Sequence, residues 1–408
     1  MELKRTYRPA LVSWNLTKKC NLACPHCYME AGDKAEVELT TEQCLTLVDE
    51  MKTLGTEMLI LTGGEPLLRR DIFDIARHAS SQGMWVVMGT NGVLVNDHVA
   101  KKMVECGVKG VGISIDSVDP CKHNEFRGGP DAWKYSVRAL EICRNHNLEV
   151  LVQSTVMQDN LEEVADLMTF ARDKGAWSFN LYYLVETGRG KQMAEQELTA
   201  EQTDASLRHL VGAQNEFAPM LVRAKCAPQF KQLAYEMGRG GMESGGCMAG
   251  TEYCRITPEG NVTPCPYMNL VAGNVLTDGF TAVWDDSQAF SDLRDTAKLK
   301  GKCGSCEFAE LCGGCRCRAY AATGDHLAED PACLYQPGTL EAPVTQDIAF
   351  TDPVIQRIDR IPIAFIREKV RRGLVAYASS HNLAVITSSD MDAAIAGTGR
   401  ALPGWAKS

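Results

Sequence analysis

The stretch ALVSWNLTKKCNLACPHC, residues 10–27, joins a short apolar run to three closely spaced cysteines. The run Ala10–Leu16 has the length and apolar content of a buried strand. Cys20, Cys24 and Cys27 follow it at x3 and x2 spacing. Metal ligands must converge on one point, and thiols on one short loop do so readily. This stretch therefore predicts a strand that leads into a metal-binding loop.

The same strand pattern recurs along the first half of the chain, from Pro9 to about Lys225. The apolar runs are Ala10–Leu16, Met58–Thr62, Trp85–Gly89, Gly110–Ile115, Val150–Thr155 and Trp177–Leu184. The expected helices are Ile72–Ser81, His98–Cys106, Trp133–His146 and Leu161–Lys174, with one more that Thr40 and Gln43 begin as a capping box. Six strand–helix alternations predict an α/β fold with a parallel sheet, either open and doubly wound or closed into an incomplete (βα) barrel.

Polar residues gather where these runs end, and parallel strands share that edge, where such folds place active sites. The residues are Thr62, Gly63, Gly64, Glu65, Asn91, Ser114, Asp116, Gln153 and Thr155. Taken singly, Asn91 before Gly92 is a turn signal, and Glu65 before Pro66 is a helix-entry signal. Their recurrence at successive strand ends predicts a binding site at this edge.

The composition limits the environment and the partners. The 408 residues include 17 cysteines and carry a net charge of −10, so no nucleic-acid partner is expected. We find no signal-peptide pattern and no apolar run long enough to span a membrane. The odd cysteine count argues against a disulfide framework and for reduced thiols in the cytoplasm. The scattered Cys44, Cys106, Cys121 and Cys143 are expected to be small residues of the core.

Beyond Lys225 the alternation ends and the cysteines become dense. They are Cys247, Cys254, Cys265, Cys303, Cys306, Cys312, Cys315, Cys317 and Cys333, with Cys226 just before them. Spacings such as Cys303-x2-Cys306 occur in zinc sites, so a pair of zinc sites is one alternative. Iron–sulfur ligation is the other.

The N-terminal motif identifies a family resemblance. Cys20-x3-Cys24-x2-Cys27, with His26 before the last cysteine and a Gly63-Gly64-Glu65-Pro66 element after the next strand, resembles the radical S-adenosylmethionine (SAM) superfamily. The resemblance implies a partial (βα)6 barrel over residues 1–225. It also implies a [4Fe–4S] cluster on the three catalytic cysteines, with SAM on the open iron. The residues it implies for cofactor binding are His26, Thr62, Gly63, Gly64, Glu65, Asn91, Ser114, Asp116, Arg127, Gln153 and Thr155. The alternative is a zinc knuckle with Cys44 or His26 as fourth ligand.

Residues 226–335 resemble the SPASM extension of radical SAM enzymes, which holds up to two auxiliary [4Fe–4S] clusters. The resemblance implies one cluster on Cys247, Cys254, Cys265 and Cys315, and another on Cys303, Cys306, Cys312 and Cys333. The usual x3 spacing after Cys312 is absent, since Cys315 follows at x2 and Cys317 at x4. Cys315 is favoured, and the choice stays open.

The C-terminal part differs in charge from the rest. Residues 336–350 are expected to form a linker, and residues 351–400 a small helical domain with a helix break near Pro362. From Thr351 onward the net charge is +3, against −13 for the rest, which suggests either a partner surface or a solvated helix face. The segment around Ile361–Arg367 resembles the small C-terminal domain of light-independent protochlorophyllide reductase.

Two further motifs resemble radical SAM proteins of haem biosynthesis: residues 187–191 (TGRGK) and residues 226–228 (CAP). The resemblance implies an enzyme that modifies porphyrinoid side chains. The leading reaction is oxidative decarboxylation of iron-coproporphyrin III propionates to vinyls, in which a deoxyadenosyl radical takes a propionate hydrogen and an auxiliary cluster takes the residual electron. The second is removal of acetate side chains from didecarboxysirohaem. An electron donor such as a ferredoxin or flavodoxin is expected.

A tetrapyrrole is a flat apolar disc with anionic arms, and needs an aromatic cleft rimmed by basic residues. Arg189, Lys191, Arg223 and Lys225 are the candidates for carboxylate recognition, with a solvated surface as the alternative. Two other functions stay open. One is a maturase of a ribosomally synthesised peptide, and the other is a non-enzymatic iron–sulfur or zinc scaffold.

Overall fold

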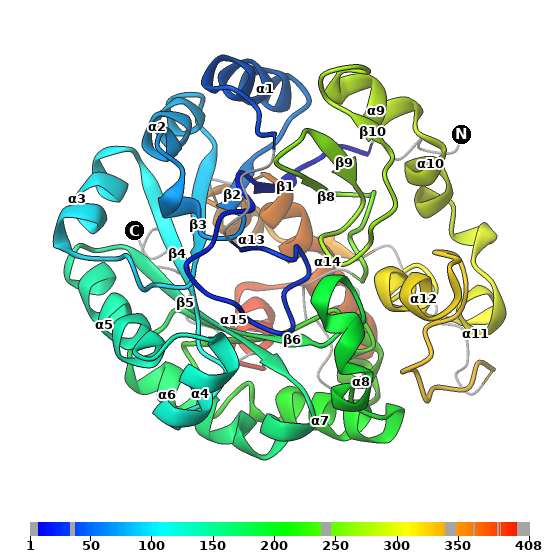
Figure 1. Cartoon of the computed structure of the whole chain (residues 1–408). Coiled ribbons are helices and arrows are strands. Elements are labelled where there is room, and N and C mark those ends of the chain that lie inside the picture. The colour runs from blue at the N-terminus through cyan, green and yellow to red at the C-terminus, as the bar shows by residue number, and fades with distance from the viewer. Residues whose placement is uncertain are drawn as a thin grey trace.

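The fold is built on one large sheet with helices along its outside (Figure 1). The computed structural model describes residues 7–32, 37–237, 246–338, 348–361, 364–381, 383 and 385–397. The sheet order is β10-β9-β8-β1-β2-β3-β4-β5-β6-β7. These strands are β1 (Leu11–Asn15), β2 (Met58–Thr62), β3 (Trp85–Thr90), β4 (Val108–Ser114), β5 (Glu149–Val156), β6 (Ser178–Tyr183), β7 (Leu221–Lys225), β8 (Tyr253–Ile256), β9 (Asn261–Thr263) and β10 (Gly273–Asn274).

Parallel pairing runs from β8 through β1 to β7, and β9 and β10 are antiparallel to their neighbours. The α/β fold and the six predicted strands are confirmed, with ends shifted by one or two residues. Two features were not predicted. β7 adds a strand after β6, and β8 of the cysteine-rich region pairs with β1. The sheet therefore continues past residue 225, where the sequence predicts the end of the first domain.

Helices follow the strands and form an arc around the sheet (Figure 1). The arc consists of α1 (Thr41–Thr53), α2 (Ile72–Ser81), α3 (Asp97–Glu105), α5 (Ala132–Asn145), α6 (Val164–Asp173) and α7 (Ala200–Ala213). The predicted capping box is confirmed, since the Thr40 side chain accepts from the Gln43 backbone N–H and Gln43 bonds back. Shorter elements lie between them: η1 (Pro66–Leu68), α4 (Pro120–Arg127), η2 (Gln158–Glu163), η3 (Gly188–Gln196) and α8 (Phe230–Glu236).

Strand alternation separates an apolar outer face from a polar interior. On β1, Val12 and Trp14 lie in the main core between sheet and helices, whereas Ser13 and Asn15 occupy the other face. Of the scattered cysteines, Cys44, Cys106 and Cys143 are buried as predicted. Cys121 is exposed on α4, so the prediction was wrong for it.

The cysteine-rich region continues through short helices beside the sheet. They are α9 (Phe280–Asp286), α10 (Gln288–Arg294), η4 (Thr296–Lys298), α11 (Gly301–Ser305) and α12 (Arg316–Thr323). Trp284 and Phe290 of α9 and α10 are buried in the main core. This region and the barrel therefore share one apolar core.

A small C-terminal module contains β11 (Ala349–Phe350), α13 (Asp352–Asp359), α14 (Ala364–Ser380), β12 (Val385–Ile386) and α15 (Ser388–Gly397). Ile366 packs on Ala10, together with Met58 and Trp85, and these three residues lie at or just before the starts of β1 to β3. The module thus contacts the edge of the sheet opposite the strand ends that carry the polar residues. Arg372 also pairs with Glu252 at 3.1 Å. Some of the predictions for this region fall outside the described residues: residues 339–347 of the linker, the helix break at Pro362, and the basic residues Arg400 and Lys407.

Several basic residues of this module have acidic partners. Arg357 pairs with Asp392 at 2.7 Å, and Arg371 with Asp359 at 3.3 Å. Part of the positive charge is thus compensated within the module. Across the described part of the chain, no helix is both long and apolar enough to cross a membrane.

Candidate functional site

The loop after β1 carries the first three cysteines, and it crosses the middle of the arc as a dark blue trace in Figure 1. We call residues 20–27 the N-terminal thiol loop. Each of its thiols has an N–H donor within sulfur hydrogen-bond range. Asn91 Nδ2 lies 3.9 Å from Cys20 Sγ, Arg127 Nη1 lies 3.7 Å from Cys24 Sγ, and the backbone N of Ala31 lies 3.5 Å from Cys27 Sγ. Such donors stabilise thiolates, the form that binds iron.

The residues after β2 fix the position of this loop. The backbone N–H groups of Gly64 and Glu65 donate to Thr17 O and Lys19 O at 2.7 and 2.8 Å. A Cβ on Gly63 would lie 2.6 Å from Thr17 O, and one on Gly64 would lie 2.2 Å from Lys19 O. The glycines are therefore required where the loop backbone passes. The sequence predicts that Gly63 and Gly64 bind the cofactor, and the structure shows that both also pack against the backbone of residues 17–19.

Glu65 connects the ends of β2 and β3. Its carboxylate accepts from Thr90 Oγ1 at 2.8 Å, from the Asn91 backbone N–H at 2.9 Å and from the Leu67 backbone N–H at 3.2 Å. Burial raises the pKa of Glu65 to about 7, although these donors oppose the shift. Because these hydrogen bonds occupy its carboxylate oxygens, Glu65 supports the residues that line the site and is not itself exposed to it.

Asp116 has a similar position behind β4 and β5. It pairs with the buried Arg127 and accepts from the Thr155 backbone N–H at 2.9 Å. Burial opposes the charge of Asp116, but the Arg127 guanidinium holds the pKa of Asp116 below its usual value. The Arg127 guanidinium, held by Asp116, is thereby placed against Cys24.

His26 contributes a neutral aromatic ring. It stacks on Phe126 with ring centroids 4.6 Å apart and planes 10° apart. Burial lowers the pKa of His26 to about 3. Its Nδ1 is buried and has no hydrogen-bond partner among the described residues. A buried polar atom without a partner fits a site that a polar ligand completes.

These residues surround a cavity of about 380 Å³, within the range of small-molecule sites. The three loop thiols line it. So do nine of the eleven predicted cofactor residues: His26, Thr62, Gly63, Gly64, Asn91, Ser114, Arg127, Gln153 and Thr155. Glu65 and Asp116 stand behind the lining. The structure thus brings the predicted strand-end residues to one place.

A second set of thiols lines the same cavity. We call Cys226, Cys247, Cys265, Cys315 and Cys317 the inner thiol group. The Sγ atoms of Cys315 and Cys317 lie 3.2 Å apart, and the Cys226 thiol contacts both. These contacts and burial raise the pKa of Cys226 well above its usual value. Cys226 was not among the predicted ligands, although residues 226–228 had been singled out as a motif. Its backbone φ of 58° is in the left-handed region.

Cys254 does not join this group, contrary to the predicted ligand set. On β8 the residues Tyr253 and Arg255 face the interior, where Tyr253 lines the cavity and Arg255 bonds Asn15. Strand alternation sends Cys254 to the opposite face, where it is buried in the main core. The x6 and x10 spacings around Cys254 could not show on which face of a strand it would lie.

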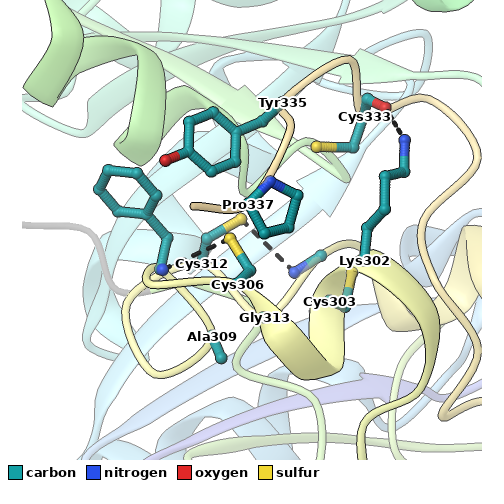
Figure 2. A pocket seen from close by; sticks show the side chains of 11 residues that line it. Lys302, Cys303, Cys306, Ala309, Cys312, Gly313, Cys333, Tyr335 and Pro337 are labelled. Atoms are coloured by element: carbon teal, nitrogen blue, oxygen red, sulfur yellow. Dashed lines mark hydrogen bonds between the residues drawn. The ribbon is translucent and has the colours of Figure 1, made fainter. Parts of the chain in front are cut away.

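The remaining thiols form a separate site (Figure 2). Cys303, Cys306, Cys312 and Cys333, the outer thiol group, line one small cavity with Phe308 and Tyr335. The backbone N–H of Phe308 donates to Cys306 Sγ and that of Gly314 to Cys312 Sγ, both at 3.4 Å. The structure therefore brings together the four residues predicted for one auxiliary cluster. Burial raises the pKa of Cys333 to about 11, so this thiol is protonated at neutral pH and must release its proton when it binds a metal.

The basic residues proposed for substrate binding have different positions. Arg189 lines the cavity, but its Nε and Nη1 donate to Cys24 O at 2.9 Å and Ala31 O at 2.6 Å, so it holds the N-terminal thiol loop. Lys191 is exposed at the surface. Arg223 stacks on Trp177 behind the lining, with its pKa lowered by burial to about 10. Lys225 does line the cavity.

Aromatic residues form part of the cavity wall. They are Tyr28, Tyr182, Tyr253 and Tyr267, and Lys231 lies on the same cavity. The Tyr28 and Tyr267 rings are 5.1 Å apart. None of these residues is among the site residues predicted from the sequence. Three of the tyrosines, Tyr28, Tyr253 and Tyr267, lie within two residues of a cysteine, but nothing in the sequence distinguishes them from core aromatics.

Comparison with known proteins places the chain. The radical SAM superfamily pattern matches residues 14–171, and the SPASM iron–sulfur cluster-binding domain matches residues 247–315. The AdoMet-dependent heme synthase of Methanosarcina barkeri (strain Fusaro / DSM 804) is 36% identical over 346 residues, covering 82% of this chain and 98% of that protein. The chain belongs to the radical SAM superfamily. The predicted resemblance is thereby confirmed.

One more relative agrees with this assignment, and one solved structure shows the same fold. The pre-heme d1 synthase of Dinoroseobacter shibae (strain DSM 16493 / NCIMB 14021 / DFL 12) is 31% identical over 353 residues, covering 80% of this chain and 86% of that protein. SuiB of Streptococcus suis bound to S-adenosylmethionine has a TM-score of 0.67 at 16% identity, over 81% of this chain and 78% of that one. It therefore shares the fold. As a radical SAM enzyme with a SPASM domain, this protein uses [4Fe–4S] clusters and SAM.

Proposed function

We propose that this enzyme modifies porphyrinoid side chains in haem biosynthesis. The leading reaction is oxidative decarboxylation of iron-coproporphyrin III propionates to vinyls, and the second is acetate removal from didecarboxysirohaem. The observation that carries the proposal is a single cavity lined by both the N-terminal thiol loop and the inner thiol group. The two relatives with haem-related names, at 36% and 31% identity, support the substrate class. A peptide maturase is the weaker alternative.

The cofactors would supply hydrogen-atom removal from an unactivated carbon and a place for the electron left on the substrate. The chain's own residues hold and shield them. Cys20, Cys24 and Cys27 would hold the SAM cluster, with their donors from Asn91, Arg127 and Ala31 keeping the thiolates oriented. A low-potential donor such as a ferredoxin or flavodoxin would supply the electron, in a reducing cytoplasm that keeps the thiols free.

For the auxiliary sites we assign two ligand sets. The outer thiol group would hold one cluster. The inner group would hold the other through Cys226, Cys247 and Cys265 with either Cys315 or Cys317. The sulfurs of Cys315 and Cys317 lie 3.2 Å apart and close together in sequence, so we assign only one of them as a ligand. The Cys226 thiol also contacts this pair, so cluster binding would have to separate Cys226 from it, because each thiolate of a cube binds a different iron. Cys226 thus takes the place predicted for Cys254.

The walls of the cavity fit a flat, anionic substrate. The rings of Tyr28, Tyr182 and Tyr267 offer apolar faces, and Lys225 and Lys231 offer positive charge. Lysine ammonium groups form charge-assisted hydrogen bonds with carboxylates, so Lys225 and Lys231 are assigned to the propionate arms.

The test is turnover under strictly anaerobic conditions. The purified holoenzyme is incubated with SAM, reductant and either iron-coproporphyrin III or didecarboxysirohaem, and the porphyrinoid mass is followed. We expect loss of propionate carboxyl groups from the first substrate. Lys225→Met should raise KM several-fold, and the surface control Lys191→Met should not. No mass change with either porphyrinoid, while SAM is still cleaved, would contradict the proposal and favour a peptide substrate.

A further inference from the structure

The first turn of α12 places two buried arginines between the two auxiliary thiol groups. Arg316 and Arg318 flank Cys317 and are each 4% exposed. The two groups are neighbours here, since the Cys247 backbone N–H donates to Cys312 O at 3.1 Å. The two guanidiniums differ in how their charge is compensated.

Arg316 points to the outer thiol group. Its Nη2 lies 3.4 Å from Cys303 Sγ, and Nη1 donates to His326 O at 3.1 Å and Ala328 O at 2.7 Å. Its Nε donates to Gly314 O at 3.3 Å. Among the described residues no carboxylate forms an ion pair with Arg316. Carbonyl groups satisfy its hydrogen bonds but leave its full charge against a cysteine sulfur.

Arg318 points to the inner thiol group, and its charge is compensated. It pairs with Asp330 at 3.3 Å and with Glu197 at 3.4 Å, and its Nη2 donates to Cys226 O at 2.9 Å. Burial opposes its charge, but Asp330 raises the pKa of Arg318 well above its usual value. The inner group therefore faces a cation that has two anionic partners. Asp330 also acts on the outer group, where it adds to burial in raising the pKa of Cys312 and Cys333, but its ion pair is with Arg318.

Asp330 also connects the segments that carry the inner thiols. It is fully buried, and its Oδ2 accepts from the Cys315 backbone N–H and from Gln229 Nε2, both at 2.7 Å. Together with the bond from Arg318 to Cys226 O, this fixes the backbones of Cys226 and Cys315, which lie far apart in the sequence.

We propose that Arg316 sets the two auxiliary clusters to different reduction potentials. Its uncompensated charge raises the potential of the cluster on the outer thiol group above that of the cluster on the inner group. A positive charge stabilises the reduced form of a cluster, because that form is one unit more negative. An electron on the inner cluster, beside the cavity, then passes favourably to the oxidised outer cluster. Arg316 is a tuning residue acting through Cys303, and the inference rests on the ligand sets assigned under the proposed function.

The experiment is a redox titration of the two auxiliary clusters, followed by EPR. The full chain is used with Cys20, Cys24 and Cys27 replaced by Ala, so that only auxiliary signals remain. In this background we expect the outer cluster to have the higher potential. Arg316→Gln should lower the reduction potential of the outer cluster and so reduce its difference from that of the inner cluster. Arg316→Lys keeps the positive charge and should leave the outer potential close to that of the Arg316 protein.

Several results would overturn the inference. One is an outer cluster whose potential is equal to or lower than that of the inner cluster, a result that needs no Arg316 variant. Another is an equal shift in Arg316→Gln and Arg316→Lys, which would show that shape rather than charge matters. Cys226→Ser, which should remove the inner signal, assigns the two spectra. Because no porphyrinoid is present, this titration can fail while turnover succeeds, or the reverse.

Discussion

The N-terminal thiol loop and the inner thiol group line the same cavity but are built in different ways. The loop takes its three cysteines from eight consecutive residues after one strand. The inner group takes its thiols from residues 226, 247, 265, 315 and 317, which converge from the end of β7, the segments around β8 and β9, and the start of α12. Local spacing determines the first site, and tertiary packing determines the second. Variants of the two sites should therefore respond differently.

The largest effect is expected at the loop. Replacing Cys20, Cys24 and Cys27 by Ala should abolish reductive SAM cleavage, because no other thiol lies on that loop. The protein should retain its auxiliary clusters and lose about four irons per chain. Iron analysis and detection of 5′-deoxyadenosine measure both effects. Residual SAM cleavage would show that this loop is not the SAM site.

The inner group gives the next largest effect, through a matched pair. Cys226→Ser should remove about four irons, because a serine hydroxyl is a poor substitute for a thiolate ligand. Cys254→Ser should keep the full iron content and lose on the order of 1 kcal/mol of stability from a buried hydroxyl. If Cys254→Ser lost the cluster and Cys226→Ser kept it, the assignment from strand geometry would be wrong.

A smaller effect is expected where the barrel holds the loop. Arg189 donates to Cys24 O and Ala31 O, and its own backbone N–H donates to Cys27 O at 3.1 Å. Arg189→Met should reduce the rate of SAM cleavage by about 10- to 100-fold, the usual cost of losing such an orienting contact. Lys191→Met, two residues away and exposed, serves as control. Equal rates of SAM cleavage in the two variants would show that Arg189 does not position the loop.

The smallest effect concerns the wall behind the loop. The His123 ring is buried, its Nδ1 accepts from the Asp116 backbone N–H at 3.2 Å, and burial lowers its pKa to about 4. Below the usual pKa of about 6.5 the unfolded chain binds a proton that the folded protein excludes. Stability is therefore lost as the pH falls from about 6.5 through about 4, by on the order of 3 kcal/mol.

Asparagine at this position keeps the acceptor and does not titrate. His123→Asn should flatten that part of the stability profile, measured by urea denaturation under anaerobic conditions. The exposed His98→Asn is the matched control. Parallel pH profiles for wild type and His123→Asn would contradict the role given to burial.

The sequence was sufficient wherever the decisive contacts are local or periodic. The six strands, the capping box at Thr40 and the strand-end residues follow from alternation and spacing. Nine of the eleven cofactor residues line the cavity because parallel strands end at one edge. Glu65 and Asp116 were assigned to the same place, but their partners come from neighbouring strands, so spacing could not show that they stand behind the wall.

The rest depended on contacts between distant segments. Cys254 pairs with Val12 of β1, which is far away in the sequence, and this pairing determines the face of β8 on which Cys254 lies. Arg189 and Arg223 are cationic like Lys225, yet one bonds the thiol loop and the other stacks on Trp177. Charge alone could not separate these roles.

The most direct test of the central claim is the metal content of anaerobically purified protein. Three thiol groups that each hold a four-iron cube predict about twelve irons and a matching amount of acid-labile sulfide per chain. Cys226→Ser and the triple loop variant should each lower this number by about four. Stoichiometric zinc in place of iron, or a full iron content in both variants, would contradict the account.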